Sequence, residues 1–299
     1  MPGIQELLED IKAPTVKNII LDTDTYNEVD DQFALAYAML SPERIRLLSV
    51  NAAPFLNKKS ESPADGMEKS YREILHIMKL VDPGAKIPCY RGSERFLSSK
   101  DEPVESAAAD NIINTVMHSK EIVYVVAIGA ITNVASAIIK CPEITRKCAV
   151  VWLGGHALHY KDTKEFNLYQ DVSAAEVVFD SQIPLVQIPC QGVCSEFLTT
   201  LPELEYYLGG KNELCDYLVG IVADYIKRGY AASKVIWDVT ALAVLTLPEA
   251  LSLEVLPVPC ITKEVKYKIK PGRHEYIYVS KIRRDPIFAD LFRKLANKK

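Results

Sequence analysis

The sequence predicts an α/β fold, in which an open, mostly parallel sheet is flanked by helices and followed by a C-terminal antiparallel hairpin. Short apolar runs rich in β-branched residues recur along the chain, as is typical of strands buried on both faces of a parallel sheet. Helical patterns separate these runs. Near the C-terminus, charged and apolar residues alternate instead. Since no internal repeat or linker is visible, one domain over residues 1–299 is the simplest interpretation.

The predicted elements follow one another along the whole chain. The predicted strands of the parallel sheet are 17–21, 45–50, 122–128, 149–153 and 183–188. The predicted helices are 32–40, 65–80, 107–118, 134–139, 173–180, 212–228 and 238–247. Segments 261–269 and 276–280, with a Pro271-Gly272 turn between them, predict an antiparallel hairpin on the sheet edge. A closing helix is expected from about Pro286.

Composition narrows the class of protein. Hydrophobic residues make up 48% and charged residues 25% of the 299 residues, which is ordinary for a globular protein. The net charge of −4 predicts no nucleic-acid partner. No window reaches the roughly 18 apolar residues of a membrane span, and residues 1–14 lack the apolar core of a secretory signal. The seven scattered cysteines predict reduced thiols, so we expect a cytoplasmic protein with no membrane contact.

Four carboxylates crowd the turn between the first predicted strand and helix. They are Asp22, Asp24, Asp30 and Asp31. A helix N-terminus favours acids, but its capping needs only one or two. Like charges near a sheet end repel one another and lose water. A hard cation or a polyhydroxyl ligand would relieve that cost, and oxygen ligands suit calcium or magnesium better than zinc.

Polar residues also follow the later predicted strands. Asn51, Thr132-Asn133 and His156 come shortly after three of them. In open α/β sheets, ligands bind outside the carboxyl ends of the strands. The sequence therefore predicts a polar ligand site at that end of the sheet.

Five motifs in order carry a family resemblance. They are Asp22-Thr-Asp24 followed by Asp30-Asp31, Gly129-Ala-Ile-Thr132-Asn133, Gly154-Gly155, Glu165-Phe166-Asn167 followed by Asp171 and Ala174-Ala175, and Trp237-Asp238. Together they resemble the nucleoside hydrolase family, the inosine-uridine-preferring nucleoside N-ribohydrolases. The resemblance covers nearly the whole chain and implies that family's fold, with a Rossmann-like core. It also implies calcium-dependent hydrolysis of the N-glycosidic bond of a riboside, by a homo-oligomer (a dimer or tetramer).

The resemblance assigns the metal ligands by position. Asp24 would be both a Ca²⁺ ligand and the base that deprotonates the attacking water. Asp31 and Asp238 would complete the carboxylate ligands, and Thr132 would offer its backbone carbonyl. Such a base fits the chemistry, because a bound cation lowers the pKa of its water.

The resemblance assigns the substrate contacts too. Asp30, Glu165 and Asn167 would hold the ribose hydroxyls, while His159 and Trp237 occupy positions where the family has an asparagine and a histidine that contact the substrate. Carboxylates around the sugar would stabilise its oxocarbenium-like transition state.

The departures from the family pattern concern the leaving group. Five residues separate Asp24 from Asp30 where the family has three, and Trp237 replaces a histidine that helps protonate the leaving base. Indole is a poor proton donor, so acid assistance would come from His156, His159 or a tyrosine, or be absent. Two alternatives stay open: hydrolysis of another ribosyl or glycosyl compound, and a metal- and sugar-binding relative without turnover.

Overall fold

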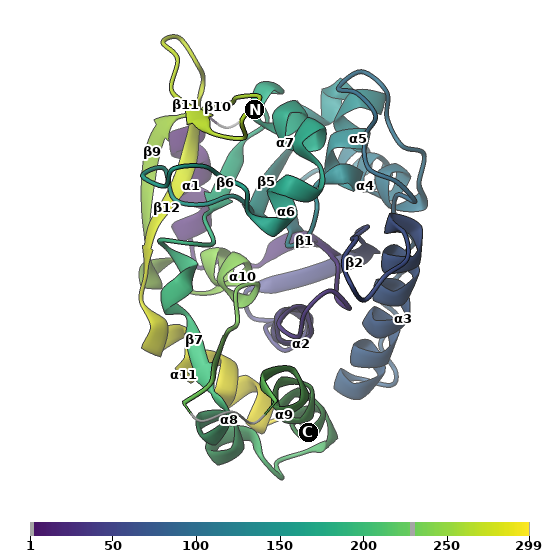
Figure 1. Ribbon diagram of the computed structural model, residues 1–299, viewed down its shortest axis with the longest axis vertical. Helices are drawn as coiled ribbons and strands as arrows, with labels where there is room; N and C mark the ends of the chain where they lie inside the picture. The colour runs from purple at the N-terminus through teal and green to yellow at the C-terminus, as the bar shows by residue number, and fades with distance from the viewer. Residues whose placement is uncertain (1–2, 228–230, 299) are drawn as a thin grey trace.

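An eight-stranded sheet runs through the middle of the molecule (Figure 1). The computed structural model describes residues 3–227 and 231–298, and the strand order is β3-β2-β1-β4-β5-β6-β12-β9. These strands are β1 (Lys17–Thr23), β2 (Ile45–Ala52), β3 (Cys89–Tyr90), β4 (Val123–Ala127), β5 (Cys148–Leu153), β6 (Leu185–Ile188), β9 (Leu251–Pro257) and β12 (Glu275–Ile282). All neighbours pair in parallel except β12 and β9. The predicted fold class is confirmed.

The strand order places a crevice at one point of the sheet. From β3 to β1 the order runs backwards along the chain, and from β4 to β6 it runs forwards. The reversal lies between β1 and β4, where Asp22 pairs with Ala127 in register. In doubly wound sheets, the ligand crevice lies outside the carboxyl ends of the strands at such a reversal.

Helices cover both faces of the sheet (Figure 1). The helices are α1 (Ile4–Lys12), α2 (Asp31–Met39), α3 (Pro63–Val81), α4 (Ala107–His118), α5 (Thr132–Lys140), α6 (Phe166–Gln170), α7 (Val172–Asp180), α8 (Leu201–Leu208), α9 (Glu213–Ile226), α10 (Val239–Thr246) and α11 (Arg284–Ala296). Alternate residues of β4 belong to different cores: Val125 to the one that includes residues of α4, α5 and α7, and Val126 to the one that includes residues of α2, α10 and α11. This two-sided burial explains why the strands read as continuous apolar runs.

The C-terminal antiparallel pair forms with a different partner from the expected one. Segment 276–280 lies in β12 as predicted, but its antiparallel neighbour is β9. The expected partner, 261–269, folds on itself instead, with β10 (Cys260–Ile261) pairing β11 (Tyr267–Lys268). The reason is local, because Val265 adopts a φ of 58° and closes a tight turn by donating its N–H to Thr262 O at 2.8 Å.

Short elements escaped the sequence patterns. The two-stranded sheet of β7 (Leu198–Thr200) and β8 (Ser233–Val235) is one example. The predicted helix 212–228 is α9, and Arg228 lies outside the described residues. All seven cysteines are free thiols, as expected. Among the described residues, none of the helices combines the length and apolar character needed to cross a membrane.

Candidate active site

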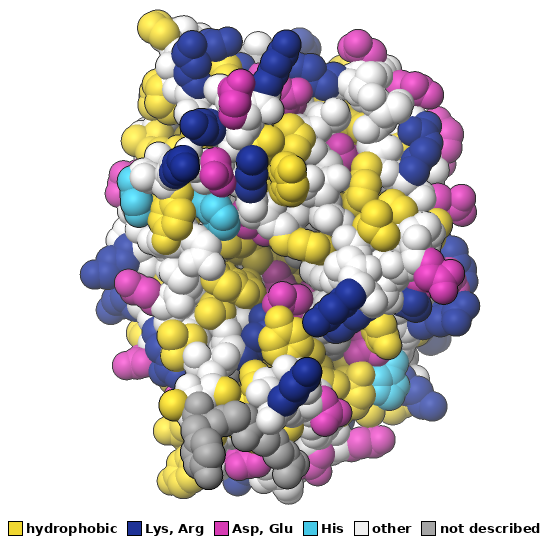
Figure 2. All heavy atoms as spheres, viewed as in Figure 1, with side chains coloured by type: hydrophobic (Ala, Val, Ile, Leu, Met, Phe, Trp, Pro, Cys, Tyr) yellow, Lys and Arg dark blue, Asp and Glu magenta, His cyan; other side chains and the backbone are white. Residues whose placement is uncertain are grey.

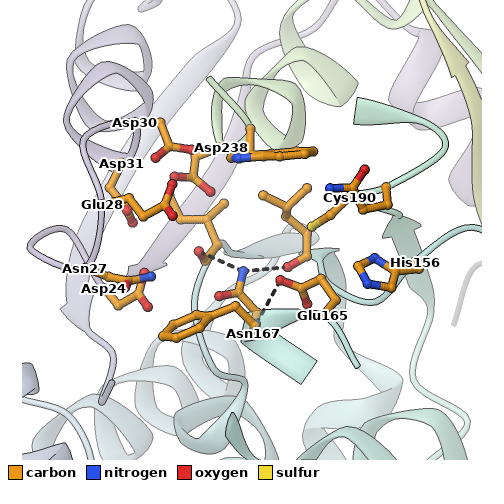
Figure 3. A pocket seen from close by; sticks show the side chains of 15 residues that line it. Asp24, Asn27, Glu28, Asp30, Asp31, His156, Glu165, Asn167, Cys190 and Asp238 are labelled. Atoms are coloured by element: carbon orange, nitrogen blue, oxygen red, sulfur yellow. Dashed lines mark hydrogen bonds between the residues drawn. The ribbon is translucent and has the colours of Figure 1, made fainter. Parts of the chain in front are cut away.

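A pocket of about 190 Å³ opens at the reversal point, next to the ends of β1 and β4 (Figure 3). The space-filling view, from the same side as Figure 1, has a hollow near its middle (Figure 2). The lining residues are Asp24, Asn27, Glu28, Asp30, Asp31, Ile128, Leu153, His156, Glu165, Phe166, Asn167, Cys190, Gln191, Trp237 and Asp238. A pocket of this volume has space for a small organic molecule.

Asp24 is buried in this pocket with one free carboxylate oxygen. It follows β1 directly and is 1% exposed, and its Oδ2 has no hydrogen-bond partner among the described residues. Gly129 makes room for it, because a Cβ at that position would stand 3.0 Å from Asp24 Cγ. Burial and the neighbouring Asp31 and Asp30 raise the pKa of Asp24 well above its usual value. A buried carboxyl with a raised pKa and an open oxygen is suited to accept a proton.

Three further aspartates converge beside Asp24. Asp30, Asp31 and Asp238 each offer a carboxylate oxygen, and these oxygens lie within 4.8 Å of one another. Asp31 begins α2 and Asp238 precedes α10, so two helix starts from distant parts of the chain bring them together. Burial and Asp30 raise the pKa of Asp31 to about 7, although the Thr23 hydroxyl donates to it. Burial and the other aspartates raise the pKa of Asp238 as well.

This donor set fits a hard cation. It consists of carboxylate oxygens, and no histidine or cysteine belongs to the described three-carboxylate group. The unpaired Oδ2 of Asp24 adds a buried acceptor. Buried carboxylates without partners are costly, and an ion such as Ca²⁺ or Mg²⁺ would offset that cost.

Asp22 lies outside this lining. It accepts a hydrogen bond of 2.9 Å from Asn133 Nδ2, and its Oδ1 has no partner among the described side chains. Burial raises its pKa to about 7. The four crowded carboxylates of the sequence therefore separate into three that line the pocket and one that is buried beside it.

Glu165 and Asn167 form hydrogen bonds with backbone groups at the ends of neighbouring strands (Figure 3). Glu165 caps α6 by accepting from the N–H groups of Asn167 and Leu168, and it also accepts from Gly155 N at 2.9 Å. Asn167 Nδ2 donates to the carbonyls of Ile128 (3.2 Å) and Leu153 (3.0 Å). Burial raises the pKa of Glu165, while these N–H donors oppose the shift. Both side chains line the pocket, as the sequence led us to expect.

Two predicted residues do not line the pocket. Thr132 is the first residue of α5, and its hydroxyl donates to Asp171 at 2.8 Å; Ile128, at the end of β4, lines the pocket instead. His159 is exposed, with its ring 5.0 Å from that of Tyr160.

The sequence named His156 and His159 as sources of acid assistance, and of these two only His156 lines the pocket. Its Nδ1 is buried without a hydrogen-bond partner among the described residues. Burial lowers its pKa, so the ring is neutral at pH 7.

Trp237 lines the pocket next to Asp238, as expected. Glu28, Cys190 and Gln191 also line it, although the sequence gave no reason to choose them.

Lys234 lies outside the lining and was not predicted from the sequence, and its ammonium lies 3.2 Å from Asp30 Oδ1. The sequence holds one signal for it: Lys234 directly precedes the apolar pair Val235-Ile236, at a position where another apolar side chain would be ordinary.

Comparisons with known proteins match this chain to one family over most of its length. The sequence profile of the inosine-uridine preferring nucleoside hydrolases matches residues 19–276. The non-specific ribonucleoside hydrolase RihC of Klebsiella pneumoniae (strain 342) is 27% identical over 268 residues, covering 81% of this chain and 82% of that protein. RihC of Escherichia coli (strain SMS-3-5 / SECEC) is 28% identical over 270 residues, with the same coverage of both chains.

Solved structures of nucleoside hydrolases share the fold. A plant nucleoside hydrolase superposes with a TM-score of 0.77 at 17% identity, covering 95% of this chain and 100% of that one. The purine-preferring ribonucleoside hydrolase from Gardnerella vaginalis gives a TM-score of 0.75 at 21% identity, covering 94% and 98%. The profile match spans most of the chain, so the chain belongs to the inosine-uridine preferring nucleoside hydrolase family and is an N-glycoside hydrolase.

Proposed function

We propose that this pocket hydrolyses the N-glycosidic bond of a ribonucleoside or a closely related riboside, with Ca²⁺ bound and Asp24 as the base. The observation that carries the proposal is the free Oδ2 of buried Asp24, in a pocket that it shares with Asp30, Asp31 and Asp238. Family membership supports the reaction class. The names of the RihC relatives, non-specific ribonucleoside hydrolases, support a riboside as substrate.

The proposed Ca²⁺ ligands are Asp24, Asp31 and Asp238, all of which line the pocket. Thr132, the carbonyl ligand that the resemblance implied, lies in α5, outside the lining. Ile128 lines the pocket at the end of β4, so we propose its backbone carbonyl as the fourth protein ligand. A cation bound by this set supplies positive charge that makes a neighbouring water easier to deprotonate.

The chain's own residues would then divide the work. Asp24 takes the proton of the attacking water, for which its buried Oδ2 without a hydrogen-bond partner is available. Asp30, Glu165 and Asn167, which all line the pocket, hold the ribose hydroxyls, and Glu165 also caps α6. As the N-glycosidic bond breaks, positive charge grows on the sugar, and the surrounding carboxylates stabilise it.

Among the described residues, neither histidine predicted to assist the leaving group supplies a charged acid to the pocket at neutral pH. His156 is neutral because burial lowers its pKa, and His159 is exposed outside the lining. We propose that Trp237 forms a flat wall against the aglycone, since an aromatic face stacks well on a planar base. Substrates whose aglycone leaves without full protonation would then be cleaved best.

A reducing-sugar assay on purified protein tests the proposed function. Purine, pyrimidine, nicotinamide and p-nitrophenyl ribosides are each incubated with Ca²⁺ and with excess chelator. Ribose release that needs Ca²⁺ supports the proposal, with p-nitrophenyl riboside expected to exceed inosine. Release unaffected by the chelator would refute the role of the metal. Absence of release from all four classes would favour a binding protein.

The homo-oligomeric state and the cytoplasmic location stay predictions from the resemblance and the composition. Light scattering coupled to size-exclusion chromatography tests the first, with a dimer or tetramer as the expected result.

A further inference from the structure

A buried lysine stands beside the carboxylates of the pocket. Lys234 is 5% exposed, and its ammonium contacts Glu28 Oε2 at very short range and Asp30 Oδ1 at 3.2 Å. It also donates to the carbonyl of Val235 at 2.8 Å. Lysine is almost never fully buried unless it is paired, and the contacts with Glu28 and Asp30 supply that pairing.

Lys234 joins two segments that are far apart in the sequence. It lies in β8, four residues before Asp238, while Glu28 and Asp30 lie in the loop between β1 and α2. Tyr225 of α9 strengthens the contact, because its hydroxyl donates to Glu28 Oε1 at 3.2 Å and its ring centroid is 5.3 Å from the ammonium. A cation facing an aromatic ring at that distance is attracted to it.

The contact between Lys234 and Glu28 involves the loop whose length departs from the family pattern. The loop from Asp24 to Asp30 contains five residues, and Glu28 is one of them. The ion pair with Lys234 fastens this longer loop close to Asp30. The ammonium forms an ion pair with Asp30 Oδ1 at 3.2 Å, although that buried oxygen has no hydrogen-bond partner among the described residues, and Asp30 itself lines the pocket.

The lysine also changes the charge of the pocket. Six carboxylates line it, from Asp24, Glu28, Asp30, Asp31, Glu165 and Asp238, and no lysine or arginine is among the described lining residues. Burial alone would lower the pKa of Lys234, but Asp30 and Glu28 raise it above its usual value, so the ammonium stays charged. Its positive charge therefore lies directly behind the acidic cluster.

We propose that Lys234 is a positioning residue that aims Asp30 at the ribose and, as a fixed positive charge, limits the affinity of the carboxylate cluster for its cation. This inference rests on the proposed function, its substrate half on the riboside and its cation half on the proposed cation site. The two halves predict effects of opposite sign: removing the lysine weakens the binding of the substrate and strengthens the binding of the cation. Removing a residue with a purely structural role would weaken the binding of both.

The test compares Lys234→Met, Lys234→Arg and the double variant Glu28→Gln with Lys234→Met. Calorimetric titration of metal-free protein gives the Ca²⁺ Kd, and steady-state kinetics at saturating Ca²⁺ give KM and kcat. In Lys234→Met, Ca²⁺ should bind about tenfold more tightly, which corresponds to ~1.4 kcal/mol. KM should rise about tenfold while kcat changes less, because ribose anchoring is felt in ground and transition states alike.

The other variants separate charge from position. The double variant keeps the net charge, so its Ca²⁺ Kd should return to within about twofold of the native value while KM stays raised. Lys234→Arg keeps the charge and restores the Ca²⁺ Kd. Lys234→Gln removes the charge but keeps a polar head, so it should also bind Ca²⁺ more tightly, which tests the electrostatic half even if Lys234→Met fails to fold.

Two results would overturn the inference. One is a Lys234→Met protein, folded by thermal melting, whose KM is native; the other is weaker rather than tighter Ca²⁺ binding in that variant. If the native protein cleaves no riboside, the proposed function fails on its own. The Ca²⁺ titrations and direct titration with D-ribose then still decide whether Lys234 acts as stated.

Discussion

At the scale of single residues, Asp24 combines three properties that seldom occur together. It is buried, one of its oxygens has no partner among the described residues, and burial with the neighbouring acids raises its pKa in the metal-free protein. Each property costs folding free energy. Their coincidence in a pocket indicates that the cost is retained for chemistry.

Replacing this base tests its role. Asp24→Asn should keep the fold and lose about 10²–10⁴-fold in kcat, because an amide cannot accept the proton of water. Steady-state kinetics at saturating Ca²⁺, on a riboside that the native protein cleaves, measure the loss. Asp285→Asn is the matched control, since its carboxylate is 89% exposed. Near-native turnover in Asp24→Asn would move the base role elsewhere.

The stacking role of Trp237 gives a second prediction. Trp237→Ala should raise KM more than it lowers kcat, because stacking on the aglycone is felt in the ground state and the transition state alike. Trp237→Phe retains a flat face and should recover most of the KM. Kinetics on one aromatic riboside compare the three proteins. Unchanged KM with collapsed kcat in the alanine variant would mean that Trp237 positions a catalytic group.

At the scale of elements, the turn from β4 to α5 controls how closely the backbone approaches Asp24. A Cβ on Gly129 would stand 3.0 Å from Asp24 Cγ and 3.1 Å from Ala53 Cβ. Neighbours at that distance must shift by a few tenths of an ångström. The glycine is therefore a spacer for the active carboxylate rather than a source of unusual backbone angles.

Gly129→Ala tests that spacer. We expect a folded protein with kcat lowered about tenfold or more, because misplacement of a reacting group costs rate steeply. Gly220→Ala in α9 is the control: its Cβ would meet nothing within 4 Å, and alanine is about 1 kcal/mol better than glycine in a helix. That control should melt slightly higher with native kinetics. Native kcat in Gly129→Ala would show that Asp24 tolerates the shift.

Elements were predictable where one local pattern decides the outcome. The apolar runs gave β1, β2, β4, β5 and β6, because both faces of each strand are buried. The partner of β12 was not predictable, since 251–257 and 261–269 both alternate and only tertiary packing selects between them. Thr132 was assigned from a motif, which does not show whether its backbone carbonyl or that of Ile128 faces the pocket, so this ligand stays a prediction. Lys234 was missed because its partner Glu28 is 206 residues away.

At the scale of the whole molecule, the fold gathers buried acids at one end of the sheet and depends on a ligand to balance them. Burial raises the pKa of Asp31 from 3.8 to about 7, and the pKa values of Asp24 and Asp238 are raised too. Between about pH 4 and 7, the metal-free folded state therefore holds protons that the unfolded state lacks. Their contribution to stability is present at low pH and is lost as pH rises through that window.

Thermal melting with and without Ca²⁺ checks this coupling. The rise in Tm on adding Ca²⁺ should be larger at pH 8 than at pH 5.5, because protons compete with the cation for the same oxygens. At a hundred times Kd, the rise at pH 8 should be on the order of 5–10 °C. The difference between the two scans cancels groups remote from the site. An equal rise at both values of pH would indicate that Ca²⁺ binds away from these aspartates.

A crystal structure of the protein with Ca²⁺ and ribose tests the central claim most directly. The account predicts one ion in the pocket, with oxygens of Asp24, Asp31 and Asp238 at about 2.3–2.6 Å, and ribose hydroxyls on Asp30 and Asn167. An ion held only by Asp30, Asp31 and Asp238, with Asp24 beyond its ligand shell, or a sugar bound outside this pocket, would contradict it.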